Sequence, residues 1–197
     1  IDVGVKEVVV YDNSEDLGCL LEQGLKERNV RDRCELIVGN ILYTNKLKNI
    51  LLKIKPDILF HAAAYKHVHL MHDNVDQAIY NNVIGTKRVI DAALESGVKI
   101  FTFISTDKVV NPTSVMGATK KLCEFYIQSL KTKKMHFNIV RFGNVINSNG
   151  SALPLFERQI DLHRYVTVTH EKMERFFMSI REAAQLVIES TAARRSN

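Results

Sequence analysis

The sequence predicts an α/β fold in which a doubly wound parallel sheet is followed by a small C-terminal lobe. Short β-branched runs alternate with segments of helical periodicity along the chain, and this alternation is typical of a parallel sheet covered by helices. The runs are almost continuously apolar, as expected of strands that are buried on both faces. The alternation ends after Asn144, where the lobe is expected to begin.

Five strands are expected, and each is a short run rich in valine, isoleucine or phenylalanine. They cover residues 7–12, 34–40, 57–64, 99–106 and 137–145. Helices are expected where apolar residues recur three or four positions apart, at 44–55, 74–98 and 118–131. Gly97 is expected to end the second of these helices, because glycine readily adopts the left-handed conformation found after a helix C-terminus.

The segment after Asn144 has a different pattern. Residues 148–160 combine turn residues with an amphipathic segment, and residues 165–169, YVTVT, alternate as a short strand does. A further helix is expected in the remainder of 170–190. This part of the chain therefore predicts a smaller lobe with one short strand.

Composition restricts the class of protein. A chain of 197 residues with 46% hydrophobic content can bury one globular core. No stretch approaches the roughly 18 to 20 apolar residues of a membrane helix, and the N-terminus lacks the pattern of a signal peptide, so we expect a soluble, cytoplasmic protein. The three cysteines, Cys19, Cys34 and Cys123, are scattered, which predicts neither a disulfide framework nor a zinc site.

The net charge of +5 does not indicate nucleic-acid binding. The lysines of 44–55 interleave with apolar residues at helical spacing and with no aromatic residues, which is typical of a solvated helix face. No metal site is expected, because the histidines show no carboxylate–histidine pattern with ligand spacing. The histidines that would be candidate ligands are His61, His67, His69, His72, His163 and His170.

Candidate functional residues follow the strands, because ligands of an open doubly wound sheet bind beyond the carboxyl ends of its strands. The residues at these positions are Asp12, Asn40, Ala62, Ala63, Ala64, Ser105, Thr106, Asp107, Lys108 and Asn144.

Asp12 ends the first expected strand, at the usual place for a carboxylate that binds the adenosine ribose. In dinucleotide-binding folds a glycine-rich turn precedes this acid by about 20 residues, and counting back from Asp12 falls before Ile1. We therefore expect the first strand, the glycine loop and the first helix to lie upstream of Ile1. The alternative for Asp12 is a turn or N-cap residue ahead of the next helix.

Five stretches then carry a family resemblance when taken together: HAAAYKHVHLM (61–71), NNVIGTKRVIDAA (81–93), STDKVVNPTSVMGATKK (105–121), RFGNVINSNGSALPLF (141–156) and VTVTHEKMERFFMSIREAAQLV (166–187). They resemble the UDP-N-acetylglucosamine 4,6-dehydratases of bacterial polysaccharide and protein-glycan biosynthesis, in the extended short-chain dehydrogenase/reductase superfamily. The resemblance implies a Rossmann domain at 1–145 that lacks its first strand and glycine loop, and part of a substrate-binding lobe at 146–197.

The resemblance also implies a reaction. It oxidises C4 of the sugar by hydride transfer to a nicotinamide, eliminates water across C5 and C6, and returns the hydride to C6. By the same resemblance, Asp107 is the acid at C6 and Lys108 the base at C5, while Thr106 orients the C4 hydroxyl. The alternative for Asp107 and Lys108 is a surface salt bridge in a loop.

Met116 and Lys120 match the superfamily's tyrosine and lysine positions. The membrane-anchored branch of the family is similar in carrying methionine at the first position, and a thioether cannot act as an acid or base at neutral pH. The resemblance implies that Lys120 binds the nicotinamide ribose. The alternatives are core packing for Met116 and a solvated helix lysine for Lys120.

The implied cofactor is NAD, with NADP as the other choice, because Asp12 would repel a 2′-phosphate. Asn40, Ala62, Ala63 and Ala64 are the further cofactor-binding candidates. The implied substrate is a UDP-sugar, for which the candidate residues are Lys66, Asn144 and Arg175, with the arginine suited to the diphosphate.

A homo-oligomer is expected. Membrane attachment, on the inner face in a full-length parent, is expected only through sequence that this chain does not contain. Two alternatives to an active dehydratase stay open. One is an inactive fragment or nucleotide-binding remnant, and the other is a sugar-nucleotide epimerase, which ranks lower because such epimerases use the tyrosine that Met116 replaces.

Overall fold

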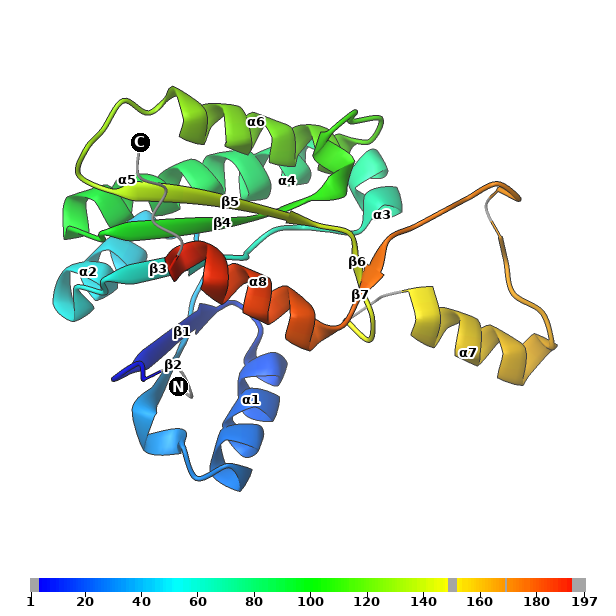
Figure 1. The fold of residues 1–197 in the computed structure, drawn as a ribbon, viewed down its shortest axis with the longest axis horizontal. Coiled ribbons are helices and arrows are strands. Elements are labelled where there is room, and N and C mark those ends of the chain that lie inside the picture. Colours follow the sequence, from blue (N-terminus) through cyan, green and yellow to red (C-terminus); the bar gives the residue numbers. More distant parts are fainter. Residues whose placement is uncertain (1–3, 149–151, 169, 193–197) are drawn as a thin grey trace.

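The computed structural model describes residues 4–148, 152–168 and 170–192, and in these residues the α/β prediction with parallel strands is confirmed (Figure 1). The strands that form the sheets are β1 (Val8–Asp12), β2 (Cys34–Val38), β3 (Ile58–His61), β4 (Ile100–Thr106) and β5 (His136–Phe142). All of their pairings are parallel, in the orders β1-β2 and β3-β4-β5.

In the described residues, these five strands divide between two hydrogen-bonded sheets instead of the single expected sheet, and two shorter strands form a third sheet. β1 and β2 form one sheet, in the lower part of Figure 1, and β3, β4 and β5 form the other. In the doubly wound order 3-2-1-4-5-6, the second and fourth strands both flank the first and do not pair with each other. β1 and β3 would be these two strands if a strand precedes Ile1, which stays a prediction.

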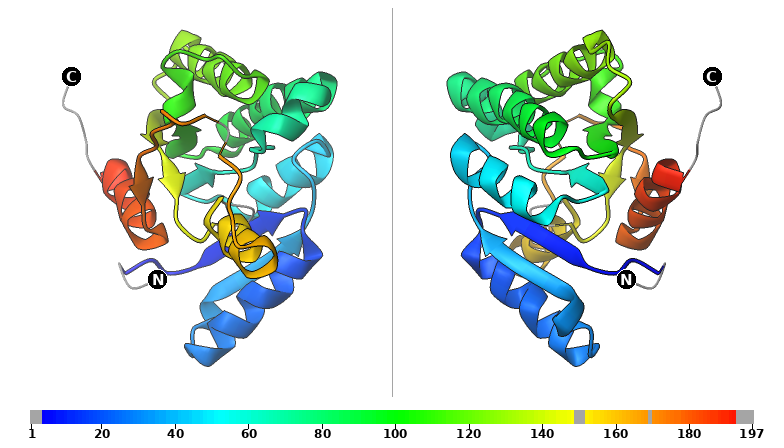
Figure 2. Two further views of the ribbon diagram at one scale, coloured as in Figure 1. Left: turned by 90° about the vertical axis from the view of Figure 1, so that its right-hand side faces the viewer. Right: turned by 90° about the vertical axis from the view of Figure 1, so that its left-hand side faces the viewer.

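Helices connect the strands and cover both faces of the larger sheet (Figure 2). The helices are α1 (Glu15–Glu27), α2 (Thr44–Ile54), α3 (Val68–Asp73), α4 (Val75–Ala78), a π-helical segment (Ile79–Ile84), α5 (Gly85–Ser96), α6 (Val115–Ser129), α7 (Ala152–His163) and α8 (Ile180–Ala192), with 3-10 turns at Arg31–Arg33 and Asp107–Val109. α5 and α6 lie on one face of β4 and β5, and α8 packs against the other. The central strand β4 is therefore buried on both sides, as its continuous apolar run predicts, whereas β3 leaves Ile58 and Phe60 exposed.

Local capping explains where these helices begin and end. Ser14 caps α1 by accepting a hydrogen bond from the Leu17 amide, and Ser114 caps α6 by accepting one from the Gly117 amide. α5 ends at Gly97, whose φ of +80° is the left-handed conformation expected there. The predicted helix at 74–98 is thus confirmed, although a π-helical segment interrupts its regular turns.

The short strand expected at 165–169 is wrong for residues 165–168, which form no strand, and Thr169 lies outside the described residues. The strand of this region is instead β7 (Phe177–Met178), which pairs with β6 (Asn144–Val145). Alternation alone cannot identify a pairing partner, and Tyr165 and Val168 are more than 60% exposed. Gly143 separates β5 from β6, so the expected strand at 137–145 is also divided.

The main core lies between the larger sheet and helices α2, α5 and α6. Phe101 and Phe103 of β4 and Ile90 of α5 are fully buried there. In the part of the chain that the structure describes, no helix combines the length and apolarity needed to cross a membrane.

His61, the last residue of β3, is buried in this core as a neutral ring. Its ring centroid lies 5.9 Å from that of Phe101 and 5.8 Å from that of Phe103, and Nε2 lies 2.8 Å from Thr86 Oγ1. Burial, with a smaller contribution from the positive charge of Lys120, lowers the pKa of His61 from 6.5 to about 3.

This burial predicts a loss of stability in mild acid. Between pH 6.5 and about 3 the unfolded state binds a proton at His61 that the folded state does not, so the free energy of unfolding falls as the pH falls through this range. Urea titrations at pH 7.5 and 5.0 should show a loss of about 2 kcal/mol that is absent in His61→Leu. His72→Leu, which removes an exposed histidine, is the control and should keep the wild-type loss; equal losses in wild type and His61→Leu would contradict the prediction.

Candidate active site

The carboxyl ends of β4 and β5 bring together three of the predicted site residues. Asp107 and Lys108 form the 3-10 turn after β4, and Asn144 begins β6 just beyond β5. Lys108 Nζ donates to Asp107 Oδ1 at 2.9 Å and to Asn144 Oδ1 at 3.2 Å. The side chains of Asp107 and Lys108 are 33% and 29% exposed. The pair is therefore half-buried and has a third polar partner, unlike a simple surface salt bridge.

Thr106 holds this turn in place. Its Oγ1 donates to Asp107 Oδ1 at 2.9 Å and accepts from the Lys108 amide at 3.4 Å. Burial acts to raise the pKa of Asp107, but the hydrogen bonds from Lys108 and Thr106 and the charge of Lys108 outweigh it and hold the pKa below its ordinary value. At neutral pH Asp107 is therefore a carboxylate.

Gly117 lets the start of α6 approach this turn closely. A Cβ atom built on Gly117 would lie 2.7 Å from the backbone oxygen of Lys108, and this oxygen cannot move without moving the turn. Only glycine therefore fits at position 117 while the Lys108 turn keeps its place.

Gly117→Ala should destabilise the protein by about 1 to 3 kcal/mol, because the added methyl group overpacks against the Lys108 backbone. Gly24→Ala in α1 is a matched control with nothing within 4 Å of its Cβ, and it should stabilise by about 0.5 to 1 kcal/mol through helix propensity. Thermal unfolding of both variants checks the prediction, and equal effects of the two would contradict it.

Lys120 lies on the buried face of α6, and the alternative of a solvated helix lysine is wrong. It is 7% exposed. Its Nζ donates to the Ile104 carbonyl at 2.8 Å and lies 4.4 Å from the ring centroid of Phe103. Burial lowers the pKa of Lys120 to about 8, although the neighbouring Cys123 and Glu124 oppose this change.

Met116 is also buried, at 5% exposed, but in a separate small apolar cluster with Met71 of α3, Ala78 of α4 and Val115. The thioether therefore packs between helices, as the core-packing alternative holds, and adds no proton donor or acceptor to the Asp107–Lys108 pair.

The cofactor candidates lie at the ends of the other three strands. Asp12 is exposed, and its Oδ1 accepts from the Ser14 amide at 2.8 Å, so it also has the turn role of the alternative reading. Asn40 Oδ1 accepts from the Leu42 amide at 2.8 Å, and the Asn40 carbonyl accepts from Tyr11 Oη at 3.0 Å.

Ala62, Ala63 and Ala64 form the loop after β3, and the first two are exposed. Asn82, in the π-helical segment, holds the continuation of this loop at Tyr65. Its Oδ1 accepts from the Tyr65 amide at 2.8 Å, and its Nδ2 donates to the Tyr65 carbonyl and to Thr119 Oγ1, both at 3.1 Å. Thr119 precedes Lys120, so this asparagine joins the β3 loop to α6.

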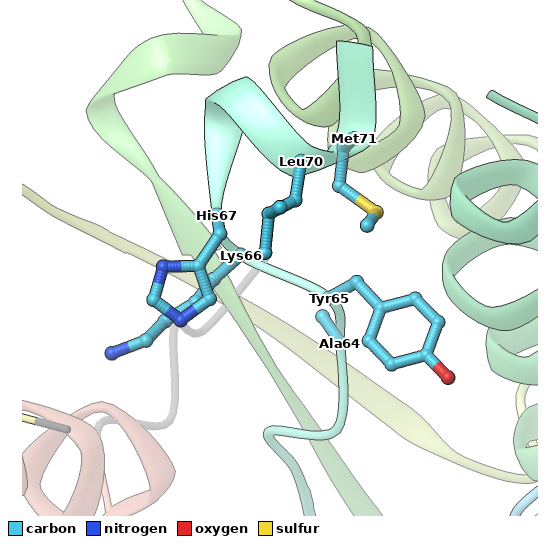
Figure 3. Close-up of a pocket in the computed structure, with 6 residues that line it drawn as sticks. All are labelled: Ala64, Tyr65, Lys66, His67, Leu70 and Met71. Atoms are coloured by element: carbon cyan, nitrogen blue, oxygen red, sulfur yellow. The ribbon is translucent and has the colours of Figure 1, made fainter. Parts of the chain in front are cut away.

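A cavity of about 350 Å³ lies beside this loop, lined by Ala64, Tyr65, Lys66, His67, Leu70 and Met71 (Figure 3). Lys66 and His67 extend to one side of it, and Tyr65 lies below Met71 on the other. Lys66 Nζ lies 3.5 Å from Ser148 Oγ, which follows β6, and partial burial lowers the pKa of Lys66. The β3 loop and the segment that follows β6 are therefore close together.

Arg175 does not join the polar contacts of Asp107, Lys108 and Asn144. It is exposed, and its Nη1 donates to the Glu174 carbonyl at 2.7 Å. The carbonyl of the next residue, Phe176, accepts a hydrogen bond from the Asn144 amide at 2.9 Å. The backbone of Arg175 therefore lies near Asn144, but its guanidinium is hydrogen-bonded to the preceding residue.

Sequence reasoning missed four residues that shape this site: Asn82, Ser105 as a buried side chain, Gly117 and Glu124. Asn82, Ser105 and Glu124 act through contacts with elements distant in sequence, and Gly117 acts through its close approach to the turn before α6. The one local signal was a charged residue, Glu124, four positions after Lys120 on the same helix face.

The chain is similar to a known protein family and to several known proteins. The chain matches the family described as "Polysaccharide biosynthesis protein" over residues 1–197. It is 47% identical over 156 residues to the probable polysaccharide biosynthesis protein EpsC of Bacillus subtilis (strain 168), covering 79% of this chain and 26% of EpsC.

Two further relatives carry names of enzymes. A UDP-N-acetylglucosamine 4,6-dehydratase (inverting) of Campylobacter jejuni subsp. jejuni serotype O:2 is 36% identical over 67% of this chain and 41% of its own length. A UDP-glucose 4-epimerase of Rickettsia canadensis (strain McKiel) is 38% identical over 67% of this chain and 40% of its own length. The chain thus spans between a quarter and half of these proteins.

Among solved structures, Pen from Bacillus thuringiensis superposes with a TM-score of 0.87 at 36% identity, covering 96% of this chain and 59% of that one. DesIV from Streptomyces venezuelae, a dTDP-glucose 4,6-dehydratase with NAD and TYD bound, superposes with a TM-score of 0.82. Its 19% identity, over 96% of this chain and 64% of DesIV, supports the fold alone. The resemblance carried by the five sequence stretches is confirmed, and the chain belongs to the polysaccharide biosynthesis protein family, whose members here include sugar-nucleotide dehydratases.

Proposed function

We propose that the protein containing this chain is a NAD-dependent 4,6-dehydratase that acts on UDP-N-acetylglucosamine. The observation that carries the proposal is the half-buried Asp107–Lys108 pair, joined to Asn144 at the ends of β4 and β5. An elimination needs a base and an acid side by side, and this pair supplies both. Membership of a family that includes named dehydratases supports the same reaction.

The residues present fit two ends of NAD. Asp12 and Asn40 at the ends of β1 and β2 would face the adenosine, with Ala62, Ala63 and Ala64 leaving room for the dinucleotide at the end of β3. Lys120 would bind the nicotinamide ribose. The glycine-rich turn that would seat the pyrophosphate is expected before β1, so we assign none of the described residues to the pyrophosphate.

When bound, NAD accepts a hydride from C4 of the sugar and returns it to C6. An exposed carboxylate at Asp12 repels a 2′-phosphate, which favours NAD over NADP. The buried ammonium of Lys120 would add positive charge on the nicotinamide side, which favours hydride acceptance.

The Asp107–Lys108 pair can become acid and base without exchanging a proton with water. Moving one proton from Lys108 Nζ to Asp107 Oδ1, over the 2.9 Å that separates them, converts the ion pair into a neutral acid and a neutral amine. Burial of the pair beneath a bound sugar favours this neutral form, because desolvation penalises charge.

The neutral pair then performs the elimination. Lys108 takes the proton from C5, which the C4 ketone acidifies, and Asp107 gives its proton to the C6 hydroxyl, which leaves as water. The pair ends as the ion pair seen in the structure. Lys108 would then give a proton to C5 as the hydride returns to C6, and the proton lost from the C4 hydroxyl on its oxidation would restore the charge of Lys108 through water. Thr106, which touches Asp107, would orient the C4 hydroxyl, and Asn144 would hold the Lys108 amine on the substrate side.

For the UDP group we propose Lys66 and Arg175. Lys66 lies beside the cavity of Figure 3 and near Ser148, and Arg175 is exposed two residues before β7. Both side chains are exposed, and the planar arginine fork is suited to a diphosphate. The division into a nucleotide-binding domain at 1–145 and a substrate-binding lobe from 146, the homo-oligomer and any membrane attachment stay predictions.

The test uses the protein expressed from its complete reading frame, loaded with NAD and incubated with UDP-N-acetylglucosamine. Mass spectrometry should find a product lighter by one water, and in deuterated water the product should carry deuterium at C5. A product of unchanged mass but altered sugar stereochemistry would instead support the epimerase, which the Rickettsia relative favours. Unchanged substrate from folded, NAD-loaded protein would refute both enzymes and leave a non-catalytic nucleotide-binding protein.

A further inference from the structure

Glu124 is a fully buried carboxylate on α6 that has no place in the proposed reaction. Its side chain is 0% exposed. Oε1 accepts from Ser105 Oγ at 2.7 Å and from Arg141 Nε at 2.8 Å, and Oε2 accepts from Arg141 Nη2. A carboxylate is costly to bury unless it is fully hydrogen-bonded, and here both carboxylate oxygens accept hydrogen bonds.

The cluster joins three elements at one point. Ser105 lies on β4 and Arg141 on β5, where the two residues are paired in register, and Glu124 lies on α6 above them. Backbone hydrogen bonds fix β4 against β5, but they do not fix α6 against the sheet. α6 is also held by single hydrogen bonds, among them those between Lys120 and the Ile104 carbonyl and between Thr119 and Asn82. Its apolar contacts, through residues such as Ile127, are not directional. The arginine–carboxylate contact is made at two points, which restrains α6 in orientation as well as in position.

The cluster lies directly beneath the candidate active site. Ser105 is two residues before Asp107, and Arg141 is three residues before Asn144. Lys120 is one helical turn before Glu124 and faces the same strands, as its hydrogen bond to the Ile104 carbonyl shows. Any sliding of α6 along the sheet would therefore move Lys120 relative to Asp107 and Lys108.

We propose that Glu124 is a positioning residue that clamps α6 to the ends of β4 and β5, so that Lys120 keeps a fixed place relative to the Asp107–Lys108 pair. The expected effect of this clamp on kcat rests on the proposed function. The clamp itself is a property of the fold and can be tested without turnover.

The charge of Glu124 also acts on Lys120. The groups that act on the Lys120 ammonium are His61 on β3 and Cys123 and Glu124 on α6, and Arg141 on β5 reaches it through Glu124. His61 is neutral, and Glu124 opposes the effect of burial on the pKa of Lys120. The neutral variant Glu124→Gln should therefore lower that pKa below about 8.

The kinetic test compares Glu124→Gln with Asp57→Asn in the complete, NAD-loaded protein. Asp57 forms an exposed ion pair with Lys99 at the opposite ends of the strands, so its variant removes a carboxylate without touching the site. Glu124→Gln should lower kcat about 10- to 100-fold while KM for the nucleotide sugar changes less than twofold. Asp57→Asn should leave both constants unchanged. A kcat within twofold of wild type for a folded Glu124→Gln protein would overturn the proposal.

Two milder variants keep the test decisive if Glu124→Gln does not fold. Ser105→Ala removes only the contact to β4, and Arg141→Lys removes the two-point contact to β5 while keeping a positive charge. Each should lower kcat severalfold without a matching change in KM. If both variants only lower the melting temperature, Glu124 is structural and the proposal fails.

A second measurement separates failure of the clamp from failure of the proposed function. Lysine labelled with ¹³C at Cε reports the titration of Lys120 by NMR, with the signal assigned by Lys120→Arg. The midpoint should be near 8 in wild type, lower in Glu124→Gln and unchanged in Asp57→Asn. Because Glu124→Gln also removes a charge, the deciding variant is Ser105→Ala, which keeps the charge of Glu124 and removes its contact to β4. An unchanged midpoint in Ser105→Ala overturns the clamp, and a shifted midpoint in a protein that shows no dehydration upholds the clamp and refutes the dehydratase.

Discussion

Replacing Lys108 by alanine is expected to lower kcat by about 10²- to 10⁴-fold, the range typical of a lost general base. The variant removes the amine that would take the C5 proton. It also leaves Asp107 without the hydrogen bond and charge that hold its pKa down, so that carboxyl should titrate closer to its ordinary value. Asp107→Asn should cause a loss of similar size, because the C6 hydroxyl then lacks its acid.

The double variant distinguishes a working pair from two independent groups. If the proton passes from Lys108 to Asp107 before elimination, removing both residues should cost little more than removing one. The matched control is the exposed pair Asp57–Lys99, in which Asp57→Asn and Lys99→Ala together should leave kcat unchanged. Multiplicative losses for Asp107 and Lys108 would contradict the shared-proton mechanism, and full activity of either single variant would contradict the assigned roles.

Lys120→Met should raise the stability of the protein and lower its turnover. Burial lowers the pKa of Lys120 from 10.5 to about 8, which means that the folded state holds the charged form at a cost of about 3 kcal/mol. Methionine fills a similar volume without charge, so the melting temperature at pH 7 should rise by about 5 to 10 °C. Turnover should nevertheless fall at least tenfold, because the proposed contact with the nicotinamide ribose is lost.

The pH dependence of this gain identifies its cause. Between about pH 8 and 10.5 the unfolded wild type keeps a proton on Lys120 that the folded state has lost, so wild-type stability rises with pH through this window. The advantage of Lys120→Met should therefore be full below pH 8 and vanish near pH 10.5. Lys121→Met, which replaces a neighbour that is not fully buried, is the control and should show no such dependence. A gain that persists at pH 10.5 would show that packing, and not charge, is responsible.

Residues at strand ends were predictable because their positions depend on one local pattern. The apolar run at 99–106 ends at Thr106, so Asp107 and Lys108 had to emerge at the carboxyl edge of the sheet. Asn144 follows the next strand by the same logic and does meet Lys108. The apolar pattern that shows where each strand ends therefore also shows where the cluster of Asp107, Lys108 and Asn144 lies.

Contacts between distant elements were not predictable in this way. No periodicity in the sequence indicates that Asn82 binds both backbone groups of Tyr65. Nor does it indicate that the Lys108 carbonyl lies too close to position 117 for a side chain to fit there. The strand expected at YVTVT failed for a related reason, since alternation is compatible with an exposed extended segment as well as with a paired strand. Which reading holds depends on the partner, and here β6 pairs with residues 177–178.

The π-helical segment at 79–84 has a consequence for how this chain can change in length. A π turn holds one residue more than an α turn, so it offsets the helical phase before it from the phase after it by about 100°. Before the offset, Ala78 meets Met116; within it, Asn82 meets the β3 loop; after it, Val89 and Ile90 face the core. Deleting one residue from the segment would restore a regular helix and turn one of these faces away from its partner. The helix can contact both the β3 loop and the core only because it carries this extra residue.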